Sequence, residues 1–135
     1  MRVALAFWYA AWCYVAVPWR SFRLRPSFRN VELLPFAIGS VRGQLLNVLL
    51  FVPLGIIGIR LGWSPRTVAA VGIGTSVLTE LLQLFSTRRY PSTTDVILNT
   101  AGVLIGMVLA RTWASMFALT NAGARINTGT DTTAS

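Results

Sequence analysis

The chain contains no histidine and no lysine, and it has a single cysteine, Cys13. Without histidine it lacks imidazole, which is the side chain best suited to proton transfer near neutral pH and the commonest metal ligand. One cysteine can form neither an internal disulfide nor a CxxC metal site. These absences exclude histidine-based catalysis, histidine metal sites and a disulfide framework, and we expect no cofactor and no metal.

Charged residues are also scarce. They make up 12% of the 135 residues, whereas hydrophobic residues make up 54%, and the mean hydropathy is +0.61. A typical soluble domain is about 25% charged. A chain of this length forms one domain at most, and such a domain has too little interior to bury this much apolar surface. The composition therefore predicts a protein that lies in lipid.

The charges that are present are mostly positive, with twelve arginines against four acidic residues and a net charge of +8. A strongly basic chain often binds nucleic acid. This chain has no nucleic-acid-binding motif, and its arginines flank apolar segments, where they face lipid headgroups. We therefore expect membrane lipid as a partner and no nucleic acid.

Four stretches are long and apolar enough to cross a membrane, which takes about 20 residues. They cover residues 3–19, 42–60, 66–88 and 94–119. The sequence thus predicts an all-α polytopic membrane protein built as a bundle of four transmembrane helices, with its domain at residues 1–119. Residues 120–135 are rich in small and polar residues, and we expect this tail to be disordered.

The first apolar stretch and the link that follows it each have an alternative interpretation. The first span resembles a signal peptide that starts at Met1-Arg2, but its aromatic-rich core and the Pro18-Trp19 pair at the cleavage position favour a retained helix. The link at residues 20–43 carries five of the twelve arginines among apolar side chains. It either lies on anionic lipid or partly covers a headgroup site.

Polar residues of the later spans recur at helical spacing. The third span holds Gly72, Ser76, Glu80, Gln83 and Thr87, the fourth holds Asp95, Asn99, Gly102 and Gly106, and the second starts with Gln44 and Asn47. Four spans place the start of the second, the end of the third and the start of the fourth at one membrane face. Polar groups in lipid are costly and face a bundle interior or a cavity. We therefore predict a ligand-binding cluster at that face, made of Asn47, Glu80, Gln83, Arg88, Arg89, Asp95 and Asn99.

Several members of this cluster have a structural alternative. Glu80 either pairs with Arg88 or Arg89 to close a hairpin, or it contacts a ligand or a proton. Asp95 either caps the fourth helix or belongs to the site. The Arg88-Arg89 pair either anchors the chain at the interface or clamps a phosphate, which the forked guanidinium fits well.

Amides and glycines have simpler roles in membrane helices. Gln83 and Asn99 more often join helices than bind ligands, and the GxxxG pattern of Gly102 and Gly106 favours close helix packing.

These residues, in this order, resemble the VanZ-like family of small bacterial membrane proteins. The similarity covers residues 29–110 and runs through N-V-E-L-L-P-F at 30–36, N-V-L-L-F-V-P-L-G at 47–55, the Glu80 to Gln83 turn, Arg89, Asp95, Asn99, Gly102 and Gly106. The chain departs from the family pattern at one place. The family often carries a further acid between its arginine and its aspartate, where this chain has Y-P-S-T-T at 90–94.

The resemblance implies a multi-pass protein of the bacterial plasma membrane, with residues 1–119 as a VanZ-like transmembrane domain. The founding member of the family is linked to resistance to teicoplanin, a glycopeptide that targets cell-wall precursors. We expect a non-enzymatic envelope protein whose polar cluster binds an anionic lipid headgroup, a lipid-linked cell-wall precursor or a partner. Whether it acts as a monomer or a homo-oligomer is left open.

Two other functions stay open at this point. The first is an intramembrane enzyme that acts on a lipid-linked substrate, with Glu80 and Asp95 as its acid/base pair, either alone or with a divalent cation on oxygen ligands. No nucleophile supports it, because Cys13 lies outside the polar cluster. The second is a transporter or channel, for which four helices give only a thin pore that a dimer could enlarge. The polar end collects seven arginines against five at the other end, which favours a cytoplasmic polar end by a small margin.

Overall fold

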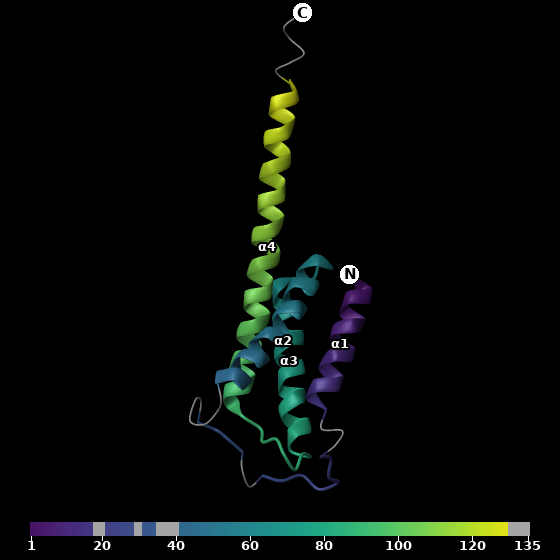
Figure 1. Cartoon of the computed structure of the whole chain (residues 1–135), viewed down its shortest axis with the longest axis vertical. Coiled ribbons are helices and arrows are strands. Elements are labelled where there is room, and N and C mark those ends of the chain that lie inside the picture. Colours follow the sequence, from purple (N-terminus) through teal and green to yellow (C-terminus); the bar gives the residue numbers. More distant parts are fainter. Residues whose placement is uncertain (18–20, 29–30, 35–40, 130–135) are drawn as a thin grey trace, which may run out of the picture.

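A computed structural model of the chain describes residues 1–17, 21–28, 31–34 and 41–129, with the side chains of the last helix described as far as Phe117. These residues form four α-helices and no strand: α1 (Arg2–Ala16), α2 (Val41–Arg60), α3 (Pro65–Gln83) and α4 (Thr93–Gly129) (Figure 1). The predicted all-α class is confirmed, and each helix falls on one of the four expected stretches.

The link between α2 and α3 follows directly from its residues. Gly62 adopts φ +80°, a conformation that residues with a side chain rarely take. Ser64 then caps α3, because its hydroxyl accepts the backbone N–H of Thr67, and Pro65 occupies the first turn, where its missing N–H costs nothing. A glycine turn, a cap and a proline thus reverse the chain between two antiparallel helices.

The helix ends differ from expectation in three places. α1 stops at Ala16 because Val17 is extended, and residues 18–20 lie outside the described part. α3 ends at Gln83, five residues before Arg88, and α4 continues beyond Leu119 to Gly129. In Figure 1 the C-terminal part of α4 projects beyond the other helices. Residues 130–135 lie outside the described residues, so the predicted disorder of the tail stays a prediction.

Two helices are long and apolar enough by themselves to cross a membrane, α2 and residues 93–117 of α4. α1 has only 15 residues, and α3 carries more polar residues. The described part of the chain therefore shows two candidate spans where we expected four.

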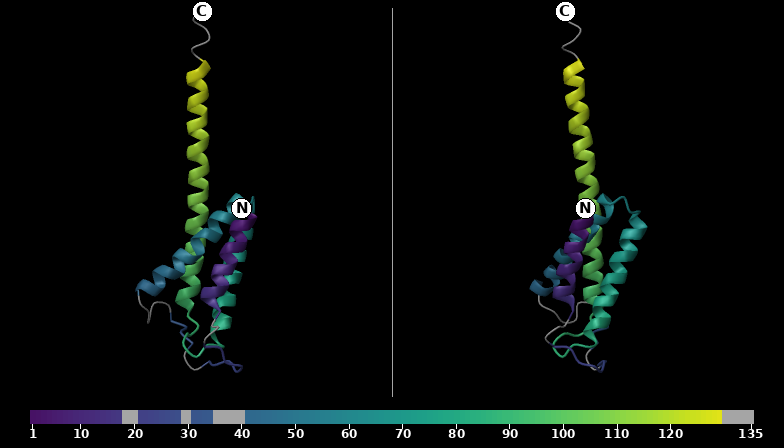
Figure 2. Two further views of the ribbon diagram at one scale, coloured as in Figure 1. Left: turned by 45° about the vertical axis from the view of Figure 1, so that its right-hand side comes forward. Right: turned by 90° about the vertical axis from the view of Figure 1, so that its right-hand side faces the viewer.

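α2 and α4 make the most extensive contact between helices, and they cross obliquely (Figure 2). The contact is close because glycines line it. A Cβ atom on Gly102 or Gly106 would clash with the carbonyl oxygen of Val48 or Val52 on α2. Small residues allow helix backbones to approach in this way.

α1 joins the other helices through two buried tryptophans. The indole of Trp8 donates to the carbonyl of Leu50 on α2 at 2.6 Å, and the indole of Trp12 donates to the hydroxyl of Thr79 on α3 at 3.0 Å. Tryptophan combines a large apolar surface with one donor that needs a partner. Both requirements are met here.

α3 is polar inside and apolar outside. Its buried face holds Thr75, Ser76, Thr79, Glu80 and Gln83, whereas Ile73, Val77, Leu78 and Leu81 are between 42% and 52% exposed. A helix in a soluble protein has the opposite arrangement. The polar residues that lower the hydropathy of α3 are thus the ones that face its neighbours.

Candidate functional site

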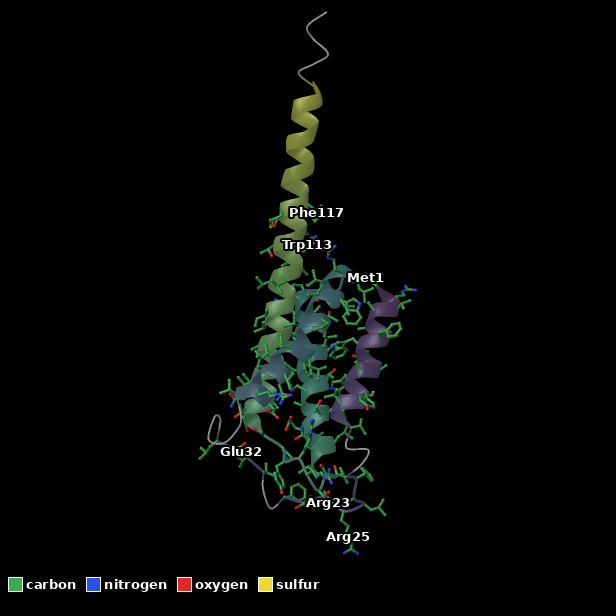
Figure 3. The ribbon with its side chains drawn as sticks, in the orientation of Figure 1. Met1, Arg23, Arg25, Glu32, Trp113 and Phe117 are labelled. Atoms are coloured by element: carbon green, nitrogen blue, oxygen red, sulfur yellow. The ribbon has the colours of Figure 1, made fainter. Side chains whose placement is uncertain are left out.

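The first long link packs against the end of α3. The backbone N–H of Arg23 donates to the carbonyl of Phe85 at 2.8 Å, and that of Ser27 donates to the carbonyl of Leu84 at 3.0 Å. The last carbonyls of a helix have no partner within the helix, and the link supplies donors just beyond that end. Figure 3 shows Arg23, Arg25 and Glu32 at this end of the molecule, opposite Met1. We call it the loop end.

Ser86 positions the arginine pair. Its hydroxyl is fully buried and accepts the backbone N–H groups of Arg88 and Arg89 at 3.1 and 3.0 Å. It also contacts the hydroxyl of Ser21 at 3.1 Å. The guanidinium of Arg89 donates to the carbonyl of Val15 at 3.3 Å, at the C-terminal end of α1, where the helix dipole favours a cation.

Glu32 is a member of the site that sequence reasoning missed. Its N–H donates to the carbonyl of Pro91 at 2.9 Å, and its carbonyl accepts the N–H of Thr93 at 3.0 Å. This pairing brings a carboxylate to the segment at residues 90–94, which lacks an acid of its own. Glu32 and its two partners lie about 60 positions apart in the sequence. Glu32 also belongs to no stretch with helical spacing of polar residues. No local pattern signals the pairing.

A pocket of about 820 Å³ opens among these elements. Five of the seven predicted binding residues line it: Asn47, Gln83, Arg88, Arg89 and Asp95. Its polar wall also includes Glu32, Gln44, Ser92 and Thr94, and its apolar wall includes Val15, Leu46, Leu49 and Leu50. The loop end therefore combines two guanidiniums, two carboxylates and three side-chain amides around one space.

Asp95 lies in the first turn of α4, where the positive end of the helix dipole favours a carboxylate. The side-chain amide of Asn47 on α2 interacts with it. The charge of Arg89 attracts the Asp95 carboxylate, and the charge of Glu32 repels it. Asp95 thus combines the position expected of a helix-terminal acid with direct access to the pocket.

Glu80 and Asn99 do not line the pocket, contrary to our expectation. The Glu80 carboxylate accepts the backbone N–H of Ser92 at 2.7 Å, and Ser92 itself lines the pocket. Glu80 therefore lies behind the pocket wall and is bonded to the main chain, which matches neither of its two alternatives, pairing with Arg88 or Arg89 and contact with a ligand. Its other oxygen is buried with no hydrogen-bond partner among the described residues.

Asn99 lies on the buried side of α4. Its amide donates to the hydroxyl of Ser76 on α3 at 3.0 Å. This contact joins two helices, which is the more common role of an amide in a membrane helix. A role in direct ligand contact is not supported for either Asn99 or Glu80.

Part of the first link, with two of its arginines and part of the 30–36 motif, cannot be placed relative to the pocket. Arg20, Arg29, Asn30, Pro35 and Phe36 lie outside the described residues. Within the described part of the chain, no group of three Asp, Glu, Cys or His residues could hold a metal ion.

Comparison with known proteins places this arrangement in a family. Curated proteins and solved structures gave no match to the chain. The VanZ/LLP1 family model matches residues 3–115, which cover α2 and α3 completely, α1 except its first residue, α4 as far as residue 115, and every residue of the pocket wall. The chain therefore belongs to the VanZ/LLP1 family.

Proposed function

We propose that this chain is a multi-pass protein of the bacterial plasma membrane, in which α1–α4 form a four-helix transmembrane bundle. We further propose that the pocket at the loop end binds the phosphate-bearing headgroup of a membrane lipid without chemical conversion. The observation that carries the binding function is the position of Arg88 and Arg89 on the wall of a pocket to which α2 also contributes the apolar side chains of Leu46, Leu49 and Leu50.

The distribution of exposed side chains supports four spans. Besides α2 and α4, α1 exposes Val3, Phe7 and Tyr14, and α3 exposes Ile73, Val77, Leu78 and Leu81. Large apolar patches are rarely exposed on monomeric soluble proteins, whereas lipid covers such side chains in a membrane. α1 is short, about 22 Å at 1.5 Å per residue, but a bilayer adapts to a short span by local thinning.

The side on which the first link lies tests whether α1 crosses the membrane, as the four-span bundle requires. With four spans, residues 2 and 25 lie on opposite sides of the membrane, whereas with only α2 and α4 spanning they lie on the same side. Both positions are exposed, so Arg2→Cys and Arg25→Cys can be made separately in a Cys13→Ser background. We expect an impermeant maleimide added to intact spheroplasts to label one and not the other. Labelling of both from the same side would contradict the four-span bundle.

The chemistry of the pocket supports a phosphate ligand. Guanidinium groups form charge-assisted hydrogen bonds to phosphate oxygens, and the amides of Gln44, Asn47 and Gln83 supply further donors. Leu46 and Leu49 are more than half exposed beside these groups. A polar headgroup with apolar chains matches this arrangement. The volume of about 820 Å³ lies within the usual range of ligand pockets, roughly 300–1,000 Å³.

The enzyme alternative receives less support from the same geometry. A general acid or base must come within hydrogen-bonding reach of the reacting group, either directly or through one water. Glu80 lies behind Ser92, and of the proposed acid/base pair only Asp95 reaches the pocket wall. A binding function does not require the Glu80 carboxylate to reach the ligand.

Lipid retention tests the binding function. The protein is extracted with a mild detergent, supplied with a phospholipid or a lipid-linked cell-wall precursor, and analysed by native mass spectrometry. We expect Arg88→Ala/Arg89→Ala to lower retention by about tenfold, because a lost charge-assisted contact costs about 1.4 kcal/mol or more. The matched control is Arg60→Ala/Arg66→Ala, which removes two exposed arginines near the α2–α3 link.

Equal retention by the pocket variant and wild type would contradict the proposal. If the variant does lose lipid, comparing the phospholipid with the lipid-linked cell-wall precursor shows which of the two supplies the phosphate. The link to teicoplanin resistance rests on the family alone, and it is tested by the susceptibility of a sensitive host that expresses wild type or the Arg88→Ala/Arg89→Ala variant.

A further inference from the structure

The described wall of the pocket is balanced in charge. Its ionisable groups of fixed sign are two arginines, Arg88 and Arg89, and two acids, Glu32 and Asp95, so their formal charges cancel. A pocket for a purely anionic headgroup gains nothing from carboxylates, which repel phosphate oxygens. The balance fits a ligand that carries both signs of charge.

The two carboxylates come from different parts of the chain. Glu32 is held by its main-chain bonds to Pro91 and Thr93, and Asp95 lies in the first turn of α4. Both carboxylates line the same pocket. One oxygen of Glu32 is shielded from solvent and has no hydrogen-bond partner among the described residues. Buried polar atoms are rarely left without a partner, so this oxygen calls for a donor.

We propose that Glu32 and Asp95 bind an ammonium group, and that the pocket takes a zwitterionic headgroup of the phosphoethanolamine class. This inference rests on the proposed function and narrows its ligand. The phosphate lies at Arg88 and Arg89, the ammonium at Glu32 and Asp95, and the start of the acyl chains along Leu46 and Leu49. Glu32 thereby becomes the residue that determines which headgroup is bound.

The wall favours a primary ammonium over two other cations. A primary ammonium donates three hydrogen bonds, which carboxylates accept, whereas a quaternary ammonium donates none and is usually bound by several aromatic rings. Among the described wall residues Tyr90 is the only aromatic one. A divalent cation takes six or more oxygen ligands, usually with several carboxylates, and no group of three acids is present in the described part.

Competition between lipids with identical acyl chains tests this ligand. Purified full-length protein is incubated with an equal mixture of phosphatidylethanolamine, phosphatidylcholine and phosphatidylglycerol, and the retained lipids are measured by native mass spectrometry. We expect wild type to retain phosphatidylethanolamine over the other two by about tenfold, the value of one charge-assisted contact. Glu32→Gln keeps the backbone pairing and the shape, and we expect it to abolish this preference while phosphatidylglycerol is still retained.

The matched control is Glu80→Gln, because Glu80 is a neighbouring acid that lies behind the wall. We expect it to keep the preference for phosphatidylethanolamine. Soluble phosphoethanolamine is added as a competitor without acyl chains, and we expect it to displace the lipid only weakly. Displacement as effective as that by the lipid would assign the site to a soluble amine phosphate and overturn the lipid ligand.

The possible outcomes distinguish a failure of the zwitterionic ligand from a failure of phosphate binding itself. If wild type prefers phosphatidylglycerol, or if Glu32→Gln leaves the preference unchanged, the zwitterionic ligand is wrong while a phosphate site at the arginines survives. If Arg88→Ala/Arg89→Ala retains every lipid as wild type does, the proposed function itself fails.

Discussion

The backbone N–H of Ser92 donates a 2.7 Å hydrogen bond to the carboxylate of Glu80. This contact ties the last turn of α3 to the residue before α4, and it fixes the start of α4, where Ser92 and Thr94 line the pocket. A buried carboxylate is costly unless it is hydrogen-bonded, and here it satisfies a main-chain donor that would otherwise be buried without a partner.

Replacing Glu80 separates this structural role from a catalytic one. We expect Glu80→Leu to lower the free energy of unfolding by about 1–3 kcal/mol, because the Ser92 N–H is left buried without an acceptor. Glu80→Gln retains an acceptor oxygen, and we expect most of the stability and all of the lipid retention to remain. Thermal unfolding in detergent measures the first effect. Loss of lipid binding in a stably folded Glu80→Gln variant would show that the acid itself acts on the ligand.

The crossing of α2 and α4 depends on glycines. We expect Gly102→Ala to destabilise the protein by about 1–3 kcal/mol, because the added Cβ clashes with the carbonyl of Val48 and the helices must move apart. Gly74→Ala on α3 is the matched control, since a Cβ there meets nothing within 4 Å. We expect that variant to gain about 0.5–1 kcal/mol from helix propensity. Apparent melting temperatures compare the two, and equal shifts would contradict the close contact.

The hydrogen bond between Trp12 and Thr79 holds α1 on α3. We expect Trp12→Phe and Thr79→Val each to destabilise the fold. The double variant should lose less than their sum, with a coupling of about 0.6 kcal/mol, typical of such bonds in membrane proteins. A double-mutant cycle on unfolding in mixed detergent measures it. Strict additivity would mean that the indole and the hydroxyl do not interact.

Ser86 tests whether the arginine pair needs its support. Its hydroxyl accepts two backbone N–H groups, so we expect Ser86→Ala to destabilise the link by about 1 kcal/mol or more and to weaken lipid retention. Ser64→Ala removes the cap of α3 at the other end of the helix, at a similar cost of about 1 kcal/mol. We expect that control to lose stability and to retain lipid normally. Equal lipid loss in both variants would trace the effect to stability alone.

Much of the site followed from helical spacing. Asn47, Gln83 and Asp95 were predicted to meet because antiparallel helices of known length bring residues at their adjoining ends to one level, and all three line the pocket. The same reasoning placed Glu80 at the polar end of α3, where the structure has it behind Ser92 and not among the residues that line the pocket. Spacing gives the face of a helix and the depth of a residue, but it does not say which neighbour covers that residue.

Composition and periodicity determined that this chain is all-α, where each helix lies, and which end of the helices is polar. These properties depend on local sequence and on the cost of placing polar groups in lipid. The tertiary structure decided that Ser92 screens Glu80 from the pocket and that Glu32 joins its wall. Both depend on main-chain bonds made by irregular segments, and the Glu32 bonds join residues about 60 positions apart. Such contacts leave no repeating pattern of residues in the sequence from which they could be predicted.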